Sequence, residues 1–293
     1  MIKVDKDYDA VPSALNRPKC KQKIQKAVIQ KSGKVYDGYY YRMAYDALKR
    51  LYYGKCAYCE SKIEHATSLQ VEHYRPKNGV QEDVKHYGYY WLGCEWSNLL
   101  LACPNCNGKG AKGIKFPIEG IRVYDGSPFS DIKKLETFDR TKLKANQSPL
   151  KDEKPLLLNP EIDEPILHLT FNSDGQIEGI TQKGKKSVKI YKLRRDLLYK
   201  ERRKVRDEIL EGIQAVILAI QLKKFKENSD AYQFFLKTAF DKLSKRKAAT
   251  EEYALWGRYC YDNFEQCFIQ KLDKAYQNGI RLAFINYKKS LKS

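Results

Sequence analysis

The sequence predicts an α+β protein, in which a small core of two short strands and one short helix, held by four cysteines, is embedded in a largely helical chain. Two C-x-x-C turns, at residues 56–59 and 103–106, bracket this core. Apolar runs of strand length end near residue 73 and begin near residue 98, and apolar residues recur at helical spacing after residue 187. A chain of 293 residues is long enough for one large domain or for two.

We expect a division near residue 150. Residues 1–150 would hold the cysteine-bracketed core, at 51–115, and residues 151–293 a β-hairpin followed by a helical C-terminal region. The turn residues Asn172–Gly175 between two apolar runs predict the hairpin. Other expected elements, in chain order, are helices over Lys21–Lys31 and Tyr41–Tyr53, a linker over 115–154, strand-like runs at Leu156–Pro160 and Ile166–Phe171, and helices from Ser187 onward, over Asp230–Ser244 and over Glu251–Lys289.

The cysteines of the two turns predict a metal site. They are Cys56, Cys59, Cys103 and Cys106. A C-x-x-C turn directs two thiolates at one ion, and two such turns complete a tetrahedral Zn²⁺ site. Two disulfides or a redox C-x-x-C are the alternatives, but the sequence shows neither secretory features nor a βαβ pattern around the first turn. A closed four-thiolate site has no open coordination position, so the expected zinc is structural.

The segment between the turns carries the candidate chemistry. Residues 71–73 (Val-Glu-His) read as the end of a short strand that Pro76 breaks, and Asn98–Ala102 reads as a buried strand that leads into the second turn. Pro104 suits the first turn of a helix. The expected order is therefore strand, long loop, strand and short helix.

This arrangement resembles the HNH (ββα-metal) endonucleases, on the residues Glu72, His73, Asn98 and Asn107 placed between and within the cysteine turns. The last position is more often histidine in that family. The resemblance implies that His73 is the general base that deprotonates the attacking water and that Asn98 orients its imidazole. It also implies that Glu72 and Asn107 bind a catalytic Mg²⁺ or Mn²⁺. A hard ion with carboxylate and amide oxygen ligands fits phosphodiester hydrolysis.

The charge of the chain favours a polyanionic partner. Lys and Arg number 55 against 36 Asp and Glu, a net charge of +19. This excess is compatible with binding of nucleic acid but indicates neither specificity nor catalysis. The cations nearest the core motif, which we expect to bind phosphates, are Arg75, Lys77, Lys109 and Lys112.

The resemblance extends beyond the core. The runs E-H-Y-R-P-K at 72–77, N-L-L-L-A-C-P-N-C-N at 98–107 and L-L-L-N-P-E-I-D-E-P at 156–165, with His168 downstream, resemble the HNH (PtuB-type) subunits of Septu and retron-associated bacterial anti-phage defence systems. The resemblance covers roughly residues 40–200. It implies an ABC-type ATPase as partner and regulator and, in retron-associated systems, a reverse transcriptase with its RNA–DNA product.

Three functions remain open at this level. The first is a metal-dependent DNase within a defence complex, and the second is the same catalyst acting on RNA such as tRNA. The third is a zinc-stabilised module that binds nucleic acid without cutting it, which the joint presence of the four motif residues disfavours. The N-terminal residues lack an apolar signal core and Ala215–Ile220 is too short to span a membrane, so we expect a soluble, cytoplasmic protein with no membrane partner.

Overall fold

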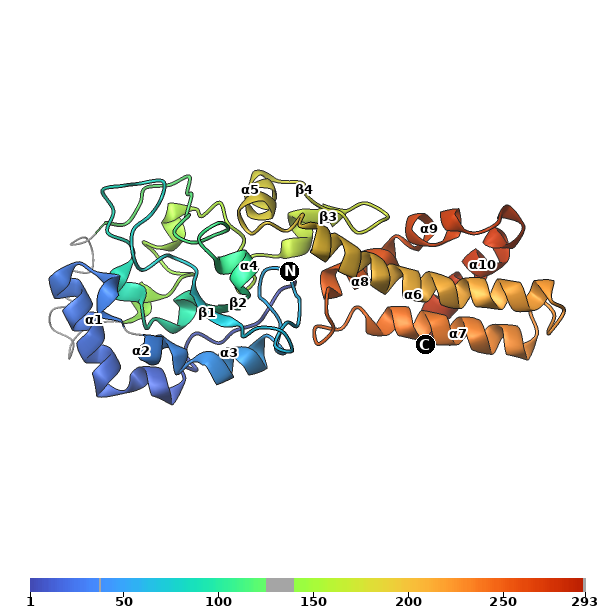
Figure 1. The fold of residues 1–293 in the computed structure, drawn as a ribbon, viewed down its shortest axis with the longest axis horizontal. Helices are drawn as coiled ribbons and strands as arrows, with labels where there is room; N and C mark the ends of the chain where they lie inside the picture. The colour runs from blue at the N-terminus through green and yellow to red at the C-terminus, as the bar shows by residue number, and fades with distance from the viewer. Residues whose placement is uncertain (37, 125–139, 292–293) are drawn as a thin grey trace. The chain divides into compact units, whose positions relative to one another are not determined.

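The computed structural model describes residues 1–36, 38–124 and 140–291 (Figure 1). Part of the expected linker, residues 125–139, lies outside this description. Helices and two small two-stranded sheets make the protein α+β, as predicted. The chain divides into two compact units. The first comprises residues 1–169 and 179–193, and the second comprises residues 170–178 and 194–293.

The first unit begins with three helices, α1 (Pro18–Gln30), α2 (Gly38–Arg42) and α3 (Tyr45–Leu51). Proline opens α1 at a position where its missing N–H is not needed, and Lys31 ends the helix in a left-handed conformation. These two features confirm the first predicted helix. The second predicted helix, Tyr41–Tyr53, is wrong as one element, because the chain leaves the helix between α2 and α3.

The core consists of strands β1 (Gln70–His73) and β2 (Leu99–Ala102), followed by the one-turn helix α4 (Pro104–Asn107) (Figure 1). The strands are antiparallel, with His73 opposite Leu99. All four residues of β2 are buried, which explains why their sequence is continuously apolar. The predicted order of strand, loop, strand and short helix is confirmed.

The expected strand at Leu156–Pro160 is wrong. An isolated bridge joins Pro155 to Ile118, and the chain then leaves the ladder. The Leu158 N–H donates to the Ser187 hydroxyl at 2.8 Å instead of to a neighbouring strand. The side chains of Leu157 and Leu158 are nevertheless fully buried, so the apolar run reports burial rather than strand conformation.

Glu161, within the L-L-L-N-P-E-I-D-E-P run, ties distant parts of the first unit together. Its Oε1 accepts hydrogen bonds from the Tyr52 hydroxyl at 2.6 Å and from Lys6 Nζ at 3.1 Å. Lys6 Nζ also donates to the carbonyls of Trp96 and Leu99, at 2.7 and 2.6 Å, where β2 begins. Glu161 therefore has a structural role, because it anchors Lys6 against the start of β2.

The chain then forms a hairpin and returns to the first unit. Strands β3 (Leu169–Phe171) and β4 (Ile177–Gly179) make the second sheet, and helix α5 (Gln182–Ile190) follows. Thr181 caps α5 by accepting from the Gly184 N–H at 3.0 Å. The same hydroxyl lies 2.8 Å from His168 Nδ1, which gives His168 a structural contact.

The second unit is built from helices around an aromatic core. Phe264 and Phe284 stack at 3.7 Å, and Phe240 meets both edge-on. The region predicted to be helical over Glu251–Lys289 contains more than one helix, and Asp273 caps the last of them by accepting from the Ala275 N–H. The helices are α6 (Asp196–Gln221), α7 (Asp230–Lys245), α8 (Ala254–Asp262), α9 (Phe264–Cys267) and α10 (Lys274–Ser290). Among the described residues, no helix is both long and apolar enough to cross a membrane.

A buried ion pair joins the loop that follows β1 to residue 153, much later in the first unit. Arg75 Nε lies 2.8 Å from Glu153 Oε2, and both side chains are at most 1% exposed. Glu153 also accepts from the Tyr89 hydroxyl at 2.6 Å and from the Val123 N–H at 3.0 Å, while Arg75 donates to the Leu150 carbonyl at 2.6 Å. Removing one partner would leave the other charge buried and uncompensated.

We therefore expect Glu153→Ala to lower the free energy of unfolding by about 3–5 kcal/mol. The exposed neighbour Asp152 provides the control, since Asp152→Ala should change it by less than about 0.5 kcal/mol. Urea denaturation of both variants tests this. Equal stability of the two variants would contradict the role given to Glu153.

Candidate active site and metal centre

The four predicted zinc ligands converge in the first unit. The sulfur atoms of Cys56, Cys59, Cys103 and Cys106 all lie within 4.8 Å of one another, and all four residues are buried. All eight cysteines lie in the described residues, and they are free thiols rather than disulfides. The first turn follows α3, and the second joins β2 to α4. The spacing of the C-x-x-C turns thus correctly predicted one cluster of four cysteines.

The geometry of the cluster suits a tetrahedral ion. The sulfur atoms of Cys59 and Cys103 are 3.7 Å apart. A zinc–sulfur distance of about 2.3 Å requires sulfurs about 3.8 Å apart in a tetrahedral site. The Cys103 N–H points at Cys56 Sγ, at 3.3 Å, and orients that sulfur. This cluster could therefore hold a structural zinc ion.

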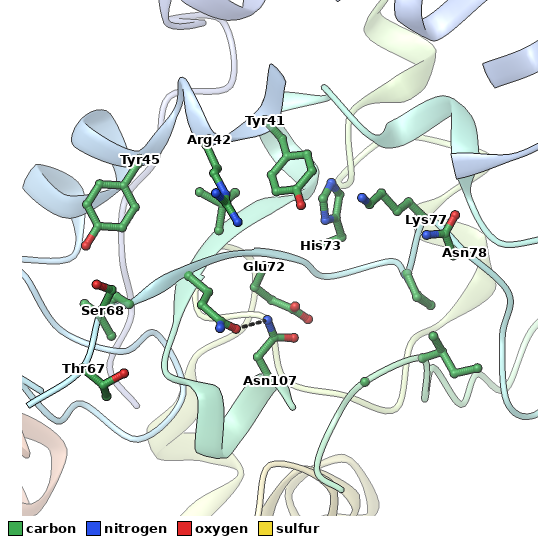
Figure 2. A pocket seen from close by; sticks show the side chains of 16 residues that line it. Tyr41, Arg42, Tyr45, Thr67, Ser68, Glu72, His73, Lys77, Asn78 and Asn107 are labelled. Atoms are coloured by element: carbon green, nitrogen blue, oxygen red, sulfur yellow. Dashed lines mark hydrogen bonds between the residues drawn. The ribbon is translucent and has the colours of Figure 1, made fainter. Parts of the chain in front are cut away.

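A cavity of about 800 Å³ opens beside β1 and contains the candidate catalytic residues (Figure 2). Glu72, His73 and Asn107 line it together. Two come from the end of β1 and the third from the last residue of α4. The β1–β2–α4 arrangement thus brings these three predicted site residues to one cavity.

His73 is held in one tautomer by its surroundings. Its Nε2 lies 3.0 Å from the Gly93 carbonyl, which can only accept, so Nε2 carries the hydrogen and Nδ1 carries the lone pair. Burial, followed by the nearby charge of Lys77, lowers the pKa of His73 to about 3. The imidazole is therefore neutral near pH 7, with its lone pair on Nδ1.

Asn98 acts on the backbone rather than on the imidazole. Its Oδ1 accepts from the Arg75 N–H at 2.7 Å, and its Nδ2 donates to the carbonyls of Arg75 and Leu92 at 3.1 and 3.3 Å. Leu92 precedes Gly93, whose carbonyl fixes the His73 ring. Asn98 therefore bonds to the two chain segments beside the imidazole, and among the described residues it makes no hydrogen bond to the ring itself.

Glu72 and Asn107 offer two oxygen ligands to the cavity. Figure 2 shows the Glu72 carboxylate and the Asn107 amide pointing toward one another. Asn107 Nδ2 donates to Gln70 Oε1 at 3.2 Å, and among the described residues its Oδ1 accepts no hydrogen bond. Burial raises the pKa of Glu72, and Lys112 Nζ, 2.6 Å from Oε1, opposes this by stabilising the charged carboxylate.

The four predicted phosphate-binding cations are placed very differently. Arg75 and Lys112 are at most 1% exposed and are paired with Glu153 and Glu72, so neither reaches a surface where a phosphate could bind. Lys109 is exposed but does not line the cavity. Lys77 does line it.

Two residues of α2 that line the cavity, Tyr41 and Arg42, were not identified from the sequence. The available signal was an arginine within the aromatic run at residues 39–45, directly ahead of the first cysteine turn. Basic residues interleaved with aromatic ones are typical of nucleic-acid contacts.

Comparison with known proteins gives three significant similarities. The chain is 34% identical over 210 residues to the Septu protein PtuB of Bacillus mycoides, covering 67% of this chain and 63% of that protein. It is 32% identical over 88 residues to the PtuB of Bacillus thuringiensis, covering 30% of each. It is also 28% identical over 201 residues to the Septu protein PtuA of Bacillus mycoides, covering 61% of this chain but only 25% of that protein.

The chain thus spans less than two thirds of the length of each of these relatives. No family model matches the sequence, and no solved structure matches it significantly. The similarity to PtuB extends over two thirds of this chain, well beyond any single motif. The chain is therefore a homologue of the Septu protein PtuB.

Proposed function

We propose that the chain is a metal-dependent endonuclease of the HNH type that hydrolyses phosphodiester bonds, with DNA the favoured substrate, as an effector of Septu anti-phage defence. The observation that carries the proposal is the shared cavity. A neutral histidine, whose Nδ1 accepts no hydrogen bond from a described residue, lines the same space as a carboxylate and an amide oxygen, beside a separate four-cysteine cluster.

In this proposal His73 is the general base. A water that enters the cavity beside Nδ1 donates its proton there as its oxygen attacks phosphorus. The P–O ester bond opposite breaks, the leaving oxygen takes a proton from solvent, and the imidazolium keeps its Nε2–H bond to the Gly93 carbonyl. Asn98 holds the segments on either side of this histidine, so that the ring does not have to be reoriented during the reaction.

Glu72 and Asn107 would hold a catalytic Mg²⁺ or Mn²⁺. The donor set fits, because hard divalent ions take carboxylate and amide oxygens and retain several waters. The ion would supply charge stabilisation for the phosphoryl group and the leaving oxygen. Lys112, buried against Glu72, would help to keep this carboxylate ionised and directed into the cavity.

The cysteine cluster would be occupied by zinc with a purely structural role. Four thiolates close the tetrahedral coordination shell, and none of the four cysteines lines the cavity. Structure and chemistry would thus depend on two different metal sites.

The partner in this proposal is the larger Septu subunit, an ABC-type ATPase that restrains cleavage. The similarity to PtuA supports an association, because a region like this chain is joined there to a much longer polypeptide. In the second unit, large apolar side chains are exposed around the end of α6 and the start of α7, which is typical of a binding surface. Among them are Leu218, the α6 C-cap Leu222, Phe234 and Phe235.

We expect His73→Ala to lower the cleavage rate by about 10²–10⁴-fold, because it removes the general base, while zinc content stays unchanged. The assay is cleavage of labelled DNA and RNA in Mg²⁺ or Mn²⁺, with and without the co-expressed partner. His65 is exposed and does not line the cavity, so His65→Ala is the matched control. Undiminished cleavage by folded His73→Ala protein would remove this residue from the mechanism.

Cys103→Ser should lose zinc and lower the melting temperature, since structural zinc contributes directly to folding free energy. Cys94 is buried outside the cluster, and Cys94→Ala should retain the metal. Elemental analysis together with thermal melting distinguishes the two. A zinc-free Cys103→Ser protein that melts as the wild type does would contradict a structural metal site.

Replacing Leu222 and Phe234 together by serine should reduce co-purification with the PtuA-type partner while leaving zinc content intact. These side chains are 59% and 65% exposed, so their replacement leaves the helical core packed. Leu167, 65% exposed in the first unit, provides the control, and Leu167→Ser should co-purify normally. Full recovery of the partner by the double variant would exclude this surface from docking.

A further inference from the structure

We propose that helix α2 completes the candidate active site: Arg42 binds the phosphate of the scissile bond, and Tyr41 positions His73 and Lys77. The inference rests on the proposed phosphodiester hydrolysis and assigns roles to two residues outside the motif. Both side chains line the cavity that holds Glu72 and His73.

The need for Arg42 follows from the charges that line the cavity. A phosphodiester carries one negative charge, and more negative charge develops on its oxygens during hydrolysis. The charge of Lys112 is already committed to Glu72. Among the described residues that line the cavity, Arg42 and Lys77 are the cations left to meet a phosphate.

Arg42 is suited to this contact. It is exposed, and within the described part of the chain it has neither an ion pair nor a hydrogen-bond partner. Figure 2 shows Arg42 on one side of Tyr41 and His73, and Lys77 on the other. A planar guanidinium can donate two parallel hydrogen bonds to a phosphate, while the lysine ammonium acts as a point charge.

The aromatic ring of Tyr41 contacts both His73 and Lys77. Its centroid lies 4.8 Å from that of the His73 imidazole, with the planes at 78°, and Lys77 Nζ lies 4.4 Å from the same centroid. Among the described residues, the imidazole's other polar contact is the hydrogen bond from Nε2 to the Gly93 carbonyl. The tyrosine ring therefore supplies a second restraint on the histidine and a cation–π contact that holds the lysine.

The separation of these roles makes them testable. Arg42 would touch the substrate, so its loss should affect every phosphodiester that the protein hydrolyses. Tyr41 would act through His73 and Lys77, so its loss should chiefly affect turnover. Its ring, rather than its hydroxyl, should carry the effect.

The first experiment compares Arg42→Gln with Arg17→Gln in the full chain, using Mn²⁺ and three probes: bis(p-nitrophenyl) phosphate, labelled duplex DNA and tRNA. Arg17 is exposed at the start of α1 and does not line the cavity. On each probe that the wild type cleaves, Arg42→Gln should lower kcat/KM about 10²-fold, and Arg17→Gln should leave it unchanged.

Binding gives a second readout that needs no turnover. In a His73→Ala background with Ca²⁺, Arg42→Gln should weaken binding of the cleaved polymer and reduce the slope of log K against log salt by about 1. If the small diester is hydrolysed at the wild-type rate by Arg42→Gln, the contact to the scissile phosphate is overturned. If the wild type cleaves none of the probes, alone or with its partner, the proposed function itself fails.

The second experiment compares Tyr41→Leu with Tyr41→Phe. Tyr41→Leu should lower kcat by roughly 10–10²-fold with a smaller change in KM, because the base and the lysine lose their common support. Tyr41→Phe should recover most of the lost turnover, and the two variants should melt alike. A Tyr41→Leu protein with wild-type kcat, or a Tyr41→Phe protein as impaired as Tyr41→Leu, would overturn the positioning role.

Discussion

The convergence of four thiols determines where the rest of the site can lie. One cysteine turn follows α3 and the other joins β2 to α4, so a shared ion would lock α3 to two elements that come much later in the sequence. The Ala57 N–H donates to the Leu101 carbonyl at 2.7 Å, which docks the first turn against β2. Strand β1 pairs with β2 and carries Glu72 and His73 to the cavity. Helix α4 has a single turn and could not persist without such an anchor.

Buried carboxylates from later parts of the chain bind polar side chains that surround this core. Glu153 meets the arginine that follows β1, and Glu161 meets the N-terminal Lys6 and the tyrosine that ends α3. Each carboxylate accepts hydrogen bonds from more than one donor, which offsets the cost of burying a charge. Such contacts are less tolerant of shifts in register than apolar packing, so they favour a single arrangement of the loops around the cavity.

How much could be predicted from the sequence differs sharply between features. The cysteine cluster and the β1–β2–α4 order were predictable, because thiol spacing, strand-length apolar runs and a helix-opening proline are local signals. The placement of the cations was not. Arg75 and Lys112 look like surface charges until Glu153 and Glu72 are known to face them. Arg42 belongs to a helix that only the tertiary fold brings to the cavity, and the breaks in the C-terminal helices depend on caps such as Asp273.

The first unit is built from two separate stretches of the chain, residues 1–169 and 179–193, so it cannot fold completely until the second stretch has been synthesised. All motif residues have been synthesised by residue 112, yet the unit also requires Tyr191, which stacks on Tyr58 at 3.8 Å, and Ser187, which holds Leu158. At about 5–20 residues per second, translation needs roughly 4–16 s more to reach residue 193. A nascent chain therefore carries every residue of the candidate site for seconds before the unit around it can close. Folding, rather than translation of these residues, sets when the candidate site is assembled.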